Sequence, residues 1–167
     1  MNGALNGWRG LVVEQLRKNG LNAIAAMESA RASRWREAVV AVSLSRVACA
    51  PGGFMDYLGV RKDPETGAES EVYGREAELT LALDVFSPKD GGEGACQTAA
   101  EAVVECLVCQ GAAGLAALEV QAGRVEFLEA DGLYRQEISC RCKAWLAARA
   151  DDETGVFTDF EVRGRLQ

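Results

Sequence analysis

Apolar and polar residues alternate one by one between Glu76 and Phe86, and this is the clearest pattern in the chain. One face carries Ala77, Leu79, Leu81, Leu83 and Val85, and the other carries Glu78, Thr80 and Asp84. Such period-two alternation is typical of a strand with one buried face. Because proline cannot donate to a β-ladder, Ser87-Pro88 predicts the end of this strand.

A helix is predicted after the glycine-rich stretch 89–94. Residues recur there at steps of three and four, all of them apolar or small except the last: Cys96, Ala99, Ala100, Val103, Cys106, Leu107 and Gln110. This spacing gives the helix one apolar stripe, and Gly111 and Gly114 predict its end. A half-buried strand followed by such a helix indicates a helix that lies across a sheet.

The N-terminal third predicts one more helix and one more strand. A stripe of apolar residues over 8–19, followed by Asn19-Gly20, predicts an N-terminal helix. The valine-rich stretch 38–47 predicts a strand. Residues 21–27 fit either a helix or a short strand.

The C-terminal third is predicted to be a set of strands. Asp131-Gly132 is a hairpin turn signal between a strand over 115–129, bent near 122–123, and a long strand over 134–146. Residues 150–167 are predicted to form either a last edge strand or an arm that pairs with a neighbouring subunit.

Residues from about 49 to 75 show no clear period and are predicted to form a long loop. Loops of this length inside a compact domain often have a function. Phe54, Met55, Tyr57 and Leu58 lie in the first half and are costly to leave in water. They either pack under the domain or contact another chain.

Length and composition fit one folded domain over residues 1–167. The chain has 49% hydrophobic and 26% charged residues, and a chain of this length buries a sizeable core. We predict an α+β domain: a mixed or antiparallel sheet, with the N-terminal and central helices packed on it. Without a signal-peptide pattern or an apolar run of about 20 residues, we expect a cytoplasmic protein and no membrane partner.

The net charge of −7 is unevenly distributed. Residues 1–50 are net basic, whereas 51–95 and 96–167 are net acidic. An acidic chain is poorly suited to direct nucleic-acid readout, because phosphate contacts need clustered Lys and Arg. The charge serves solubility, or it lets the basic end of one copy meet the acidic middle of a neighbour.

Little catalytic chemistry is visible in the sequence. The chain has no histidine, which excludes Ser-His-Asp sites, Cys-His sites and histidine-based zinc sites. Gly91-Gly92-Glu93-Gly94 lacks the Gly-Lys-Ser/Thr ending of a phosphate-binding loop and is interpreted as a connector. We expect no catalytic residues and no cofactor.

The cysteines leave one alternative open. Cys106 and Cys109 lie one turn apart on the predicted central helix, and Cys140 and Cys142 share the inward face of the long strand. If that helix covers that strand, four thiols could converge on zinc. The first competing interpretation is that these cysteines fill the core as small apolar residues. The second is a disulfide, which a reducing compartment disfavours.

Four segments resemble proteins of prophage tail modules: Phe54-Met-Asp-Tyr-Leu-Gly59, Tyr73-Gly-Arg75, Leu81-Ala-Leu-Asp-Val-Phe-Ser-Pro88 and Phe157-Thr-Asp-Phe-Glu-Val-Arg-Gly164. The element order is similar to that of the tail terminator family, which includes the minor tail protein U group of siphophages. The resemblance implies a ring, often hexameric, that caps the tail tube and meets the head–tail connector. Its partners would be other copies, the tube protein and the connector. It would be found in the bacterial cytoplasm during assembly and in the virion tail.

Charge and resemblance together give an interface hypothesis. Arg31, Arg34 and Arg36 of one copy would face Glu65, Glu69 and Glu71 of the next, with Phe54, Tyr57 and Leu58 as apolar contacts. The alternative for these charges is a solvated surface. Other functions left open are a neck adaptor, a tail tube subunit and, in a different class, a cysteine-based metal-binding module.

Overall fold

A computed structural model describes residues 4–25, 35–51, 56–150 and 157–163, with side chains described over 7–25, 35–51 and 56–146. The helices are α1 (Ala4–Lys18), α3 (Gly92–Gln110) and a short 3-10 turn, η2 (Lys89–Gly91). The strands are β1 (Ala23–Ala25), β2 (Val39–Pro51), β3 (Tyr57–Lys62), β4 (Glu69–Pro88), β5 (Ala117–Leu128), β6 (Leu133–Ala150) and β7 (Phe157–Arg163).

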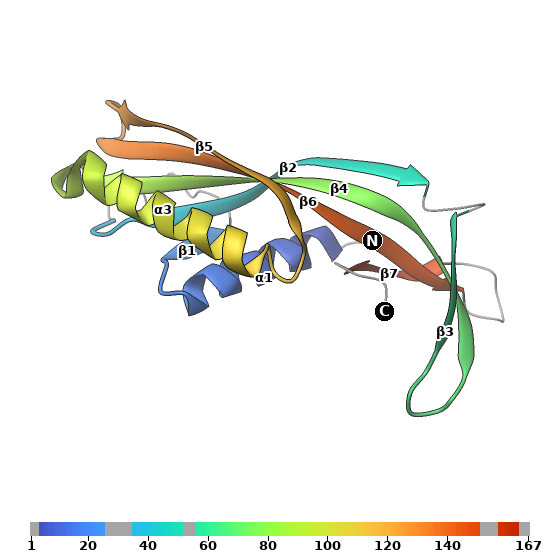
Figure 1. Ribbon diagram of the computed structural model, residues 1–167. Coiled ribbons are helices and arrows are strands. Elements are labelled where there is room, and N and C mark those ends of the chain that lie inside the picture. Colours follow the sequence, from blue (N-terminus) through green and yellow to red (C-terminus); the bar gives the residue numbers. More distant parts are fainter. Residues whose placement is uncertain (1–3, 26–34, 52–55, 151–156, 164–167) are drawn as a thin grey trace.

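The strands form one mixed sheet with both long helices on the same side (Figure 1). The order is β1-β2-β4-β6-β5, and β3 and β7 pair with β4 and β6 respectively. β1 is parallel to β2, and the other pairs are antiparallel. The α+β class, the mixed sheet and the two helices packed on it are therefore confirmed.

The core lies between this sheet and the helices. Leu79, Leu81 and Leu83 of β4 are fully buried, as the alternation predicts. Inward residues of β6 and the stripe of α3 meet them: Ile138, Cys140, Cys142, Ala144, Cys96, Ala100, Val103, Cys106 and Leu107. Each fully buried Leu or Ile side chain contributes about 1.5–3 kcal/mol.

The predicted loop over 49–75 is wrong, because most of it is β-structure. β2 runs antiparallel to β4 as far as the pair Pro51–Arg75, and β3 continues along β4 from Tyr57–Tyr73 to Lys62–Glu69. β2, β3 and β4 thus make one long hairpin. Side chains on both faces of its distal part are exposed or only half-buried, so the sequence shows no apolar period there.

The hairpin is closed by a turn over 63–68. The Asp63 carboxylate accepts hydrogen bonds from the backbone N–H groups of Glu65 (2.8 Å) and Thr66 (2.9 Å). This is the local bonding that makes aspartate a common turn residue. Near the base, the Arg75 guanidinium lies 2.9 Å from the Asp56 carboxylate and ties the start of β3 to β4.

The remaining differences from the predictions are small. The ambiguous stretch 21–27 contains the short strand β1, and α3 begins at Gly92, inside the predicted glycine-rich connector. β5 continues through the predicted bend, with its register shifting between Ala122 and Val125. β7 pairs with β6 of the same chain, so this part of 150–167 is an edge strand.

Candidate functional site: a projecting arm and two open sheet edges

The distal half of the long hairpin projects beyond the helices as an arm, formed by β3 and residues 69–74 of β4 (Figure 1). Its apolar residues are poorly covered: Tyr57 is 42% exposed and Val60 is 56% exposed. Only the tip of the arm, where residues 60–62 pair with 69–71, is two-stranded, because residues 72–74 also pair with β6. A two-stranded hairpin alone is marginally stable in water, and exposed apolar residues on a projection are typical of a surface that another chain covers.

The arm carries an ordered aromatic pair. The rings of Tyr57 and Tyr73 meet edge to face with centroids 5.5 Å apart, and the Tyr73 hydroxyl donates to the Glu71 carboxylate over 2.6 Å. This hydrogen bond to Glu71 raises the pKa of Tyr73, so the phenol stays a neutral donor.

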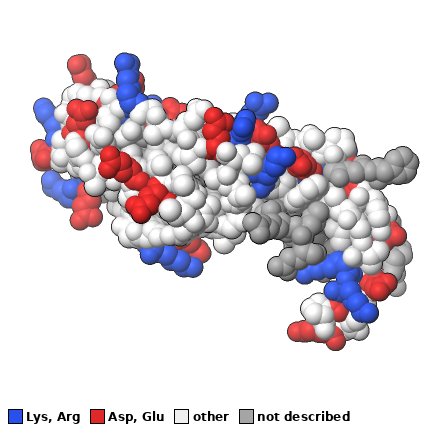
Figure 2. Space-filling view, in the orientation of Figure 1, with Lys and Arg blue, Asp and Glu red and all other residues white. Residues whose placement is uncertain are grey.

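Several predicted interface residues lie on this arm. Glu65, Glu69 and Glu71 are exposed, Tyr57 is exposed and Leu58 is half-buried. Arg61 and Lys62 lie on the same arm, and Figure 2 shows blue and red atoms together near its end. Arg31, Arg34 and Phe54 lie outside the described residues.

Arg36, the remaining predicted arginine, is exposed at the other end of the sheet. It precedes β2, whose first residue Val39 pairs with Phe86, whereas Glu69 begins β4. The separation between residues 69 and 86 is about 55 Å of strand contour. Arg36 and the acidic arm therefore cannot pair within one copy, and their pairing between copies stays a prediction.

Two sheet edges are open in the described part of the chain. On one side, β1 covers β2 only at residues 40–42, and the outer edge from Ser43 onward has no described partner strand. On the other side, β5 is the last strand of the path. Open edges present unpaired backbone groups that readily pair with another chain.

The helix-free face of the sheet carries cross-strand ion pairs. Lys143 lies 2.6 Å from Glu76, and Arg135 lies 2.6 Å from Asp84. The hydrogen bond to Asp84 raises the pKa of Arg135, which stays charged. These side chains are a quarter to a half exposed, so each pair contributes about 0–1 kcal/mol.

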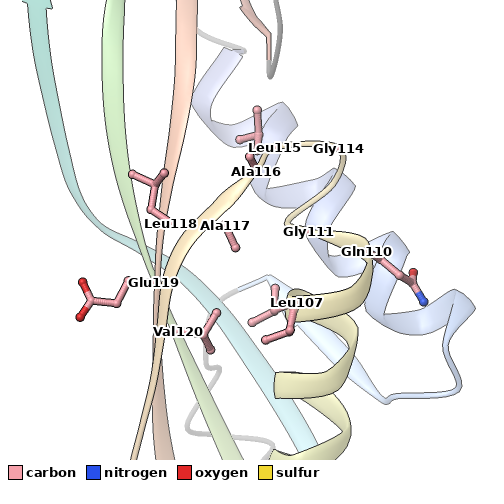
Figure 3. A pocket seen from close by; sticks show the side chains of 11 residues that line it. Leu107, Gln110, Gly111, Gly114, Leu115, Ala116, Ala117, Leu118, Glu119 and Val120 are labelled. Carbon is pink, nitrogen blue, oxygen red and sulfur yellow. The ribbon is translucent and has the colours of Figure 1, made fainter.

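A groove of about 540 Å³ lies between the end of α3 and the start of β5 (Figure 3). Leu107 and Val120 point into it, and Ala117 lines its wall. Beside it, Val108 is 65% exposed and Leu118 is 44% exposed. Most of the side chains that line the groove are apolar, although Gln110 and Glu119 also line it, and the groove follows the start of β5.

The four thiols of the zinc hypothesis do not converge. Cys106, Cys140 and Cys142 are buried, whereas Cys109 is exposed. Over the part of the chain that the structure describes, no three Cys, Asp or Glu side chains form a group suited to a metal ion. The structure gives this alternative no geometric support.

The buried thiols behave as core residues. The Sγ atoms of Cys140 and Cys142 lie 3.5 Å apart, and the hydrogen bond between them together with burial raises the pKa of Cys142. Burial also raises the pKa of Cys96 and of Cys106. Because the thiolate is the reactive form, the thiols of Cys96, Cys106 and Cys142 are poor nucleophiles near neutral pH.

Sequence reasoning missed two exposed residues on these surfaces. Val60 was not identified because residues 49–75 were predicted to form a loop. Arg46 is exposed on the open part of β2 and makes no ion pair with any residue in the described ranges. A signal did exist, because Arg46 is the one charged residue within the apolar stretch 38–50.

Comparisons with known proteins add little to this geometry. No family model matches the chain, and no curated protein matches it. Among solved structures, it is similar to a chain described as "Virion of native gene transfer agent (GTA) particle", with 16% identity, a TM-score of 0.40, and coverage of 81% of this chain and 92% of that chain. At that TM-score the likeness carries no information on function. Of the helices within the described ranges, none combines the length and apolar character that crossing a membrane requires.

Proposed function

We propose that this chain is a structural subunit of a phage-type tail, and specifically a ring-forming terminator or completion subunit that caps the tail tube. The proposal starts from the resemblance of its sequence segments to tail-module proteins. The projecting arm is the structural observation that carries it. A monomer working alone gains nothing from exposing Tyr57 and Val60 on a projecting arm.

The open edges support the same function. Copies that contact each other through two different surfaces form a heterologous interface, which closes into a ring when the rotation permits. This chain has two different surfaces of that kind, one on β2 and one on β5. It would act by binding its neighbours, without a catalytic step.

Electron microscopy tests the proposal directly. Purified protein is mixed with tail tubes that lack their terminal cap, and we expect a ring at one end of each tube. Decoration along the whole tube would instead indicate a tube subunit, and binding to the head connector alone would indicate a neck adaptor. Absence of any binding to tubes or connectors would contradict a role in the tail.

A further inference from the structure

We infer that the chain binds a second copy of itself edge to edge, with the free part of β2 pairing antiparallel with the first half of β5 in the neighbour. The inference rests on the proposed function, because it names the contact by which copies follow one another around the ring. It uses the two open edges and the residues that the sheet register places along them.

The strand directions fit this contact. β2, β4, β6 and β5 are antiparallel in turn, so β2 and β5 run in opposite directions at the two edges. A rotation about an axis along the strands keeps each strand's direction. The β2 edge of one copy therefore meets the β5 edge of the next in the antiparallel sense, which is the more stable pairing.

The register places opposite charges at the same level. One row across the sheet consists of Arg46, Thr80, Arg141 and Glu119. Glu119 lies 3.2 Å from Arg141 and points to the side of β5 away from α3 (Figure 3). A neighbour docked without a shift along the strands brings its Arg46 opposite Glu119, which extends the charge ladder of the helix-free face.

The adjacent levels are apolar on both edges. Leu44 lies in the row of Val120, and Val47 lies in the row of Ala117. Val47 is 36% exposed, and Val120 and Ala117 line the groove beside α3. The same docking therefore places Leu44 and Val47 of one copy near Val120 and Ala117, which line the groove of the next copy.

This contact cannot form within one chain. β4 and β6 separate β2 from β5, so Arg46 and Glu119 lie about 14 Å apart across the sheet. A disulfide needs Cα atoms within about 7 Å. A disulfide between positions 46 and 119 must therefore join two copies.

The test is disulfide trapping in a background without exposed thiols, Cys49→Ser with Cys109→Ser. The chain carrying both Arg46→Cys and Glu119→Cys is oxidised at its highest soluble concentration and run on non-reducing gels. We expect a ladder from dimer upward. Each single variant should stay monomeric, and a mixture of the two single variants should give dimers only.

The matched control moves one cysteine along the same strand. In the variant with Arg46→Cys and Glu126→Cys, the second cysteine stays on β5 and on the same face of the sheet. It lies at a different position along the strand, because Glu126 pairs with Arg135 whereas Glu119 pairs with Arg141. We expect at least a fivefold lower yield. No ladder with the 46–119 pair, an equal ladder with the control, or dimers from Glu119→Cys alone would overturn the inference.

A second pair separates this contact from the one predicted from charge. Edge pairing keeps Arg36 and the arm at opposite ends of the strands. The variant with Arg36→Cys and Glu69→Cys should therefore form no disulfide between copies. A ladder of 36–69 disulfides in place of the 46–119 ladder would overturn the inference. If the protein caps tail tubes but the 46–119 cysteine pair forms no disulfide between copies, this contact is rejected and the tail function stands. If the 46–119 disulfide forms but tail tubes stay uncapped, the tail function is rejected and the contact stands.

Discussion

Gln15 of α1 donates a hydrogen bond from Nε2 to the backbone oxygen of Gly111 over 2.8 Å, just past the end of α3. Its Oε1 accepts from the backbone N–H of Ala113, a non-glycine residue with φ of 53°. One side chain thus satisfies two backbone groups in the turn that leads into β5. This turn also borders the groove, so Gln15 links α1 to the surface proposed to receive a neighbour.

Replacing Gln15 by Leu should destabilise the fold by about 1–3 kcal/mol, because two partly buried backbone groups lose their partner. Urea unfolding followed by circular dichroism measures the change. Asn19→Ala is the matched control: Asn19 also joins the two helices, through Gln110, but its bonds are exposed. A cost for Gln15→Leu no larger than that of the control would contradict this role.

Gly111 is predicted to be intolerant of any side chain. Its φ is 72°, and a Cβ there would lie 2.4 Å from the backbone oxygen of Leu115. Gly111→Ala should therefore cost more than the roughly 1 kcal/mol of φ strain alone. Gly114→Ala supplies the comparison, since Gly114 has φ of 84° but nothing within 4 Å of its Cβ position. Equal unfolding free energies for the two variants would rule out the clash.

Stability should fall as the pH rises above about 9, because of the buried thiols. Burial raises the pKa of Cys96 and Cys106 above the ordinary value of 9.0, so in the unfolded chain these thiols ionise first. Their stabilising effect is complete below pH 9 and is lost as the pH rises toward their folded pKa values. Each thiol adds up to about 1.4 kcal/mol per pH unit to the slope.

Cys96→Ala should make this pH dependence shallower, whatever it does to stability at neutral pH. Unfolding free energies between pH 8 and pH 10.5 give the slope. Cys49→Ser, which changes an exposed thiol, is the control and should leave the slope as in the unaltered chain. If both variants had the same slope, ionisation of Cys96 would not contribute.

The strands with one fully buried face could be predicted from the sequence, whereas the strands of the arm, which has no buried face, could not. Leu79, Leu81 and Leu83 alternate with less buried residues because the helices cover one side of β4. This alternation can be recognised in the sequence. In the arm, neighbours such as Val60 and Arg61 are both accessible, so no period marks the strand. Backbone pairing with β4 determines that structure, and pairing between distant segments leaves little trace in composition.

The candidate surfaces were predictable only in part for the same reason. Glu65, Glu69 and Glu71 were identified because charges are visible in any sequence. The relation between Arg46 and Glu119 depends on the register of three strand pairs, including two bulges, and emerges only from the folded sheet.

Shortening the arm should abolish the capping of tail tubes without unfolding the domain. The variant deletes residues 61–70 and joins Val60 to Glu71 through Asn-Gly, a two-residue turn suited to hairpins. None of the deleted side chains is buried, so the unfolding free energy should change by less than about 1 kcal/mol. We expect the shortened protein to fold, as measured by circular dichroism and urea unfolding, and to leave tail tubes uncapped in electron micrographs.

A control variant that removes the negative charges of the arm separates the effect of its shape from the effect of its charge. Replacing Glu65, Glu69 and Glu71 by Gln retains the hairpin backbone and its exposed Tyr57 and Val60. If the partner recognises the shape and length of the arm's tip, residues 61–70, this variant should still cap tubes, whereas the shortened variant should not. Loss of capping in both would indicate that the acidic residues make the contact, as the charge hypothesis predicts. Capping by the shortened variant would show that the arm is not part of the binding surface.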